Sequence, residues 1–265
     1  MLKIYQRLWQ VNWAEQWQYR ANSIMYLLYW IVSPIIYLAV WTSIANSKGD
    51  VNGLTANDFV TYYMTMLVVD QITSNITIHI FAYKVQDGSL SSELIRPIHP
   101  MLTTTLVNNV AFKILTIMGL IPSWIILFFL FKPDFSGVSL VGVLLSIPVM
   151  MVAFIIGFLL SATIVSLAFW TTRVYSIHEF YFALILLFSG QFVPLPLMPQ
   201  VIQNIAQYLP FQLLLYFPIQ LILGKLSIDQ IILGYIMAGV WLVVAILAFN
   251  CVWRQGVKQY SAVGA

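Results

Sequence analysis

The sequence has very few charged residues. Only 8% of its 265 residues are Asp, Glu, Lys or Arg, whereas 61% are hydrophobic. Soluble domains carry about 25% charged residues, and no soluble fold could cover this much apolar surface. The scarcity of charge therefore excludes a soluble protein and predicts an integral membrane protein. Since no run of basic residues occurs either, the sequence offers no nucleic-acid-binding surface.

Cysteine, clustered histidine and enzyme motifs are also missing. Cys251 is the one cysteine and lies in the last apolar segment, so it can form no disulfide within the chain. His79, His99 and His178 are scattered, and their spacing predicts no metal site. Neither a phosphate-binding GxxxxGK[ST] loop nor a Ser/His/Asp arrangement occurs. We therefore expect a chain that is not an enzyme and that binds no cofactor or metal itself.

The sequence does contain a series of long apolar segments. Each approaches or exceeds the roughly 20 residues that a helix needs to cross a bilayer. They predict an all-α fold with six transmembrane helices, at residues 21–45, 59–83, 102–131, 140–170, 175–192 and 231–253. No cleavable signal and no internal repeat is recognisable, so we expect residues 1–265 to form a single membrane domain.

Residues 1–20 precede the first of these segments and are amphipathic. Trp9, Trp13 and Trp17 recur every four residues and therefore share one face of a helix, whereas Lys3 and Arg7 lie away from it. Such a stripe predicts a helix lying in the headgroup layer. The alternative is that these aromatic residues simply begin the first transmembrane helix.

Lys and Arg are distributed unevenly between the two sides of the predicted helices. If the N-terminus is cytosolic, nine of the 12 lie on that side, and only Lys48, Lys132 and Lys225 lie outside. Because cytosolic loops carry the excess of Lys and Arg, we predict a cell (inner) membrane protein with both termini in the cytosol.

The second predicted helix is unusually polar. Asp70, Ser74 and Thr77 would share one helical face, and Gln71 and Asn75 lie on the neighbouring one. Polar groups in hydrocarbon are expensive and usually face protein or a water-filled cavity. This pattern predicts a translocation path or a subunit interface, unless part of the segment lies at the membrane boundary.

Two segments between the predicted helices have their own pattern. Residues 84–100, here called the 84–100 loop, are rich in turn formers and predict a short helix over residues 89–95, capped by Ser91 or Ser92. Residues 193–226, here called the outer segment, predict short re-entrant helices, because prolines prevent a continuous helix. The turn-forming prolines of the outer segment are Pro194, Pro196, Pro199 and Pro210, and Pro218 is expected to interrupt its second helix.

The order of these features resembles the permease subunits of ABC-2 type transporters, the ATP-binding-cassette export class. The most specific local similarity is FSGQFVPLPLMP at residues 188–199 followed by YLPF at residues 208–211. A further similarity is GSLSSELIRP at residues 88–97, in the position of the family's coupling helix. The resemblance covers nearly the whole chain.

The resemblance implies a mechanism and partners. Two permease chains, identical or related, would pair around a path, and a separate ABC ATPase would carry the ATP and Mg. The residues that the resemblance places at the contact with the ATPase are Leu90, Leu94 and Ile95 as apolar knobs, with Glu93 and Arg96 at the rim. Two other classes stay open: a secondary transporter or channel that uses Asp70, and a membrane assembly subunit without transport of its own.

The predicted topology can be tested by labelling cysteines introduced singly at Ser47, Gln200 and Ser261. An impermeant thiol reagent added to intact cells should label the first two sites and spare the third, because both termini are predicted to be cytosolic. Labelling of the Ser261 site in intact cells would refute the six-helix topology.

Overall fold

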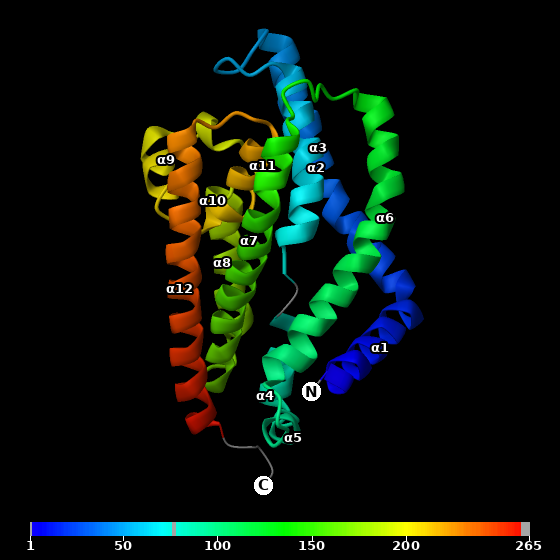
Figure 1. The fold of residues 1–265 in the computed structure, drawn as a ribbon, viewed down its shortest axis with the longest axis vertical. Helices are drawn as coiled ribbons and strands as arrows, with labels where there is room; N and C mark the ends of the chain where they lie inside the picture. The colour runs from blue at the N-terminus through cyan, green and yellow to red at the C-terminus, as the bar shows by residue number, and fades with distance from the viewer. Residues whose placement is uncertain (1, 76–77, 261–265) are drawn as a thin grey trace.

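The computed structural model of this chain describes residues 2–75 and 78–260. Within these ranges the chain forms helices and no β-strand, apart from one isolated bridge between Val51 and Leu54. The helices α3 (Ala56–Thr73), α7 (Leu140–Ser166) and α12 (Ile228–Gln259) run roughly along the long axis of the molecule, whereas α1 (Leu2–Gln18) lies obliquely to it (Figure 1). The all-α fold predicted from the sequence is therefore confirmed.

Within the described ranges, four helical segments are long and apolar enough to cross a membrane. They belong to α2 (Arg20–Lys48), α6 (Val107–Phe131), α7 (Leu140–Ser166), which continues into η2 (Leu167–Phe169), and α12 (Ile228–Gln259). These helices correspond to the first, third, fourth and sixth transmembrane helices predicted from the sequence. The chain is thus a multi-pass membrane protein.

The second predicted transmembrane helix is not continuous. It consists of α3 (Ala56–Thr73) and α4 (Ile78–Gln86), and Ser74 already has an extended backbone. The helix predicted over residues 59–83 is therefore wrong. The physical reason is that Ser, Thr and Asn side chains compete with the helix for backbone hydrogen bonds. α3 nevertheless lies at the centre of the fold, where it packs against α2, α6, α7 and α11 (Tyr216–Ile222).

The fifth predicted transmembrane helix is the shorter α8 (Val174–Phe188). It ends at a turn in which Gly190 has a φ of 82°. This turn is held from two sides, because the Tyr62 hydroxyl donates to the Gly190 carbonyl at 2.8 Å and the Tyr216 amide donates to the Ser189 carbonyl at 3.0 Å. The Tyr63 hydroxyl and the Trp41 indole both donate to the Phe192 carbonyl just beyond the turn.

The outer segment forms several short helices at the end of the molecule opposite both termini (Figure 1). Pro194 precedes η3 (Leu195–Leu197), which contains Pro196, and Pro199 and Pro210 come just before the next two helices. Those are α9 (Gln200–Ala206) and α10 (Phe211–Leu214), and α11 follows them. The interruption predicted at Pro218 is wrong, since the break falls at Leu215. Pro218 lies in the first turn of α11, where a missing amide hydrogen costs little.

The remaining helices are α1 (Leu2–Gln18), α5 (Ser91–Leu94) and η1 (Met101–Leu106). In α1, the Trp9 and Trp13 rings stack at 5.8 Å between centroids, so the predicted aromatic stripe forms a continuous surface. α1 packs against α6, where the Asn108 amide donates to the Asn12 side chain at 3.3 Å.

Gly190→Ala should destabilise the fold, because a methyl group there would lie 2.7 Å from the Tyr62 hydroxyl and the backbone is left-handed. The left-handed conformation alone costs a non-glycine residue about 1–2 kcal/mol. Gly239→Ala is the matched control, since nothing lies within 4 Å of the added methyl group inside α12. Denaturation in detergent should show a loss of stability for Gly190→Ala and no loss for Gly239→Ala. Equal stability of the two variants would contradict the role of this turn.

Candidate functional site

The 84–100 loop folds into a compact unit at the end of the molecule that holds both termini (Figure 1). Gly88 turns the chain with a φ of 80°, and the Leu90 amide donates back to the Lys84 carbonyl at 3.1 Å. The single turn of α5 follows. Ser91 and Ser92 do not cap it as predicted, because their hydroxyls donate to the carbonyls of Gly88 and Ser89 instead.

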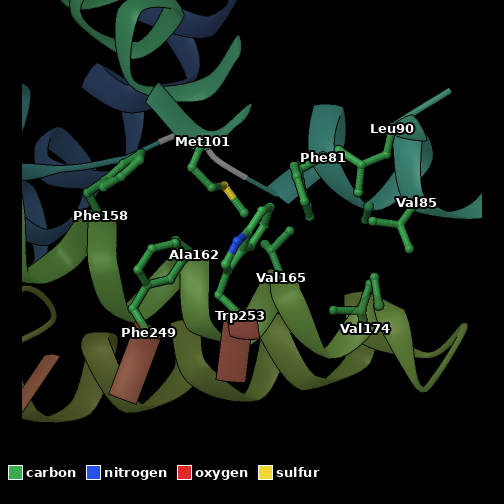
Figure 2. Close-up of a cluster of buried hydrophobic side chains, with 12 residues drawn as sticks. Phe81, Val85, Leu90, Met101, Phe158, Ala162, Val165, Val174, Phe249 and Trp253 are labelled. Atoms are coloured by element: carbon green, nitrogen blue, oxygen red, sulfur yellow. The ribbon is translucent and has the colours of Figure 1, made fainter. Parts of the chain in front are cut away.

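Leu90 belongs to the internal core and not to the exposed surface. Its side chain is fully buried in a cluster that also contains Phe81, Met101 and Trp253 (Figure 2). The buried residues of this cluster come from α4, the residue before α5, η1, α7, η2, α8 and α12, and Figure 2 labels ten of them. The prediction of Leu90 as an exposed knob is therefore wrong. Residues four apart share a helical face, but the sequence does not say which side of the helix faces the core.

The other predicted contact residues of the loop differ among themselves. Glu93 is buried and forms an ion pair with Lys84 at 2.5 Å, so it is not a rim residue as predicted. Leu94 is partly buried against the core cluster. Ile95 is 86% exposed, and Arg96 is exposed beside it. Of the predicted set, Ile95 and Arg96 are thus the side chains that the fold presents to the surroundings.

The loop is attached to the C-terminal part of the chain. The Tyr260 hydroxyl, just after α12, donates to the Gly88 carbonyl at 2.9 Å. The His99 ring packs on Trp253 of α12, with 4.4 Å between the ring centroids. The loop is therefore in contact with the C-terminal end of α12 near both of its own ends.

A second polar site lies at the break between α3 and α4. The Lys113 ammonium of α6 donates to the Gln71 carbonyl at 2.8 Å and to the Ser74 hydroxyl at 3.2 Å. It thereby satisfies a carbonyl that the end of α3 leaves without a helical partner, and a cation is favourable at this end of a helix. Lys113 also interacts electrostatically with Asp70, which is buried in the last turn of α3.

Asn75 completes this site from the break itself. Its amide donates to the Thr73 carbonyl at 3.2 Å and to the Phe154 carbonyl of α7 at 3.4 Å. Gly157 leaves room for that amide, since a methyl group there would approach it to 2.8 Å. The oxygen of the Asn75 side chain is buried and accepts no hydrogen bond from the described residues.

The structure therefore brings together Asp70, Ser74 and Asn75, although they do not share the face of one continuous helix. Thr77 lies outside the described residues. The partner that the sequence interpretation missed is Lys113. The sequence could have predicted this interaction, because Lys113 within one apolar segment and Asp70 deep in another are expected to pair.

Comparison with known families decides the class of the protein. A family model described as "ABC-2 family transporter protein" matches residues 19–264. The chain belongs to this family. A comparison with curated proteins gives no match. Membership makes the chain a membrane permease of an ABC transporter, and it implies an ABC ATPase as partner.

In this ABC-2 transporter, Lys113→Met should lower the free energy of unfolding by about 1.5–3 kcal/mol, because it removes the charged donor to the Gln71 carbonyl and the Ser74 hydroxyl and the cation that acts on the buried Asp70 carboxylate. Asp70→Asn removes that carboxylate, so adding it to Lys113→Met should restore part of the loss. We expect a coupling energy of at least about 1 kcal/mol from SDS titrations of the two single variants and the double variant.

Lys48→Met is the control for loss of a lysine, since Lys48 is exposed at the end of α2. It should change stability by no more than about 0.5 kcal/mol. Strictly additive effects of Lys113→Met and Asp70→Asn would show that the two charges do not act on each other.

Proposed function

We propose that this chain is the permease subunit of an ATP-driven exporter and that its 84–100 loop receives the movement of a separate ABC ATPase. The family match supports the transporter class. The assignment of the loop rests on two observations. Leu90 and the Lys84–Glu93 ion pair fix the loop to the helical core, and Ile95 and Arg96 are exposed at its surface.

The contacts of the loop suit the transmission of a displacement. Leu90 inserts into the core cluster, where it joins α4 to α7 and α12. The ion pair between Lys84 and Glu93 ties α5 to the end of α4. A push on Ile95 would therefore reach several helices at once. In this proposal Ile95 and Arg96 contact the ATPase, whereas Leu90, Leu94 and Glu93 fix the loop to the permease.

The proposed orientation follows from the distribution of basic residues. The end of the molecule with both termini also carries the 84–100 loop (Figure 1), and the excess of Lys and Arg lies in these regions. We place this end in the cytosol of a cell (inner) membrane. The six-helix topology then requires α3 with α4 to form one crossing and α8 another.

The polar site of Asp70, Ser74 and Asn75 is proposed to face the translocation path or a second permease chain, which is identical or related. Backbone that leaves helical geometry at membrane depth is tolerated where it is buried in protein or lines a cavity. ATP and Mg are assigned to the partner ATPase, and this chain itself is proposed to be non-catalytic.

The proposal is tested with tagged permease purified in mild detergent from its native membrane. Wild-type chain should retain an ATPase subunit, and ATP turnover should be measurable in the eluate. Ile95→Glu should weaken that association by about 2 kcal/mol or more, roughly 30-fold, because a central apolar contact is replaced by a charge. The permease itself should remain folded, since Ile95 is exposed in the isolated chain.

Val201→Glu is the matched control. Val201 is 68% exposed on α9, at the opposite end of the molecule. It should leave ATPase retention and turnover unchanged. Unchanged binding and turnover in Ile95→Glu would move the transmission point to another loop. Cargo movement without any ATPase would support a secondary transporter instead.

A further inference from the structure

A pocket of about 540 Å³ lies between the 84–100 loop and the last turns of α12. One wall is formed by Leu94 and residues 96–100, and the other by Trp253, Arg254, Val257 and Lys258. Volumes of this size are typical of small-molecule sites. The pocket is separate from the polar site at the end of α3, and Ile95 is not among the residues that line it.

The charged side chains that line this pocket are all positive. Arg96, Arg254 and Lys258 line it, and no acidic side chain does. The ion pairs of the described residues join Lys84 to Glu93 and Lys225 to Asp58, so none of the three lining cations is neutralised in that way. Three uncompensated cations around one cavity favour an anionic ligand, and Arg in particular matches the oxygens of a phosphate.

His99 adds a neutral hydrogen-bond donor to the same pocket. Its Nδ1 accepts a hydrogen bond from the Met101 amide at 3.2 Å, so Nε2 is the ring nitrogen that remains to donate. Burial lowers the pKa of the His99 imidazole, which is therefore uncharged near neutral pH. The positive charge of the pocket thus comes from the two arginines and the lysine.

The pocket also has an apolar part. Leu94, Trp253 and Val257 lie beside the cations, and Pro97 and Pro100 belong to the same lining. Trp253 and Arg254 stand where the apolar part of α12 ends, and this combination is typical of a membrane–water interface. A ligand with a charged head and an adjoining apolar chain would satisfy both parts.

We propose that this pocket binds the phosphate-bearing headgroup of an anionic phospholipid from the cytosolic leaflet. Basic pockets beside transmembrane helices on the cytosolic side are suited to such headgroups. The inference rests on the cytosolic orientation proposed above. Arg96 also belongs to the proposed ATPase contact, whereas Arg254 and Lys258 belong to the pocket alone. A lipid held here would join the 84–100 loop to α12 and would thereby stabilise the attachment that His99 and Trp253 already provide.

The test uses the full chain, delipidated in a neutral detergent and titrated with palmitoyl-oleoyl-phosphatidylglycerol or with the corresponding phosphatidylcholine. Bound lipid is counted by native mass spectrometry. Wild-type chain should retain the phosphatidylglycerol and bind the phosphatidylcholine far more weakly. Arg254→Gln combined with Lys258→Gln should weaken phosphatidylglycerol binding by roughly tenfold or more.

The matched control combines Arg7→Gln with Arg173→Gln, which removes the same charge from exposed residues that do not line the pocket. It should bind phosphatidylglycerol as the wild type does. Equal loss in the control and the pocket variant would overturn the proposal, as would equal binding of the two lipids by the wild type.

A competition experiment identifies the source of the phosphate. Sodium phosphate at millimolar concentration should fail to displace the phosphatidylglycerol, whereas full displacement would assign the pocket to a soluble phosphate compound.

The pocket variant is also tested for ATPase retention. Loss of the ATPase with unchanged lipid binding would show that the pocket receives an acidic segment of the partner, and would overturn the lipid assignment while leaving the proposed function intact.

Discussion

A helix that ends in the buried interior of a protein leaves its last carbonyl groups without water or helical partners, and this constraint organises the fold. α3 ends at Thr73, and the Lys113 ammonium from α6 supplies the missing donor. Asn75 connects the same end to the backbone of α7. α3 packs against α2 and α6 and also against α7 and α11. The contacts at its end therefore lie between these two pairs of helices.

The 84–100 loop is fixed to the helices although part of it is exposed. Its firmness comes from placing Leu90 in the core and from pairing Lys84 with Glu93 at a site that water reaches poorly. Ile95 and Arg96 at its tip remain exposed. A loop built in this way is packed as an extension of the adjoining helices, and such packing suits the proposed transmission of movement from an ATPase.

Composition and segment length were sufficient to predict an integral membrane protein and the long helices α2, α6, α7 and α12. The prolines of the outer segment predicted its short helices, and the family resemblance predicted the transporter class. These patterns were not sufficient where a contact between distant residues decides the structure. The polar residues of the second segment fit a helical period, but the bond between Lys113 and the Gln71 carbonyl joins elements 42 residues apart. Likewise, the spacing of Leu90 and Leu94 fits a helix, yet the direction of that face depends on α7 and α12. Family resemblance located the loop without revealing which of its side chains are buried.

The length of α8 has a consequence for the surrounding lipid. Its 15 residues extend about 22 Å at 1.5 Å per residue, whereas the hydrocarbon core of a bilayer is about 30 Å thick. Phe180 and Phe182 on its surface are exposed in the isolated chain. If α8 forms one of the proposed crossings, the bilayer beside it would have to thin to match its length. A change in acyl-chain length would then change the mismatch at α8 and shift the position of the neighbouring short helices.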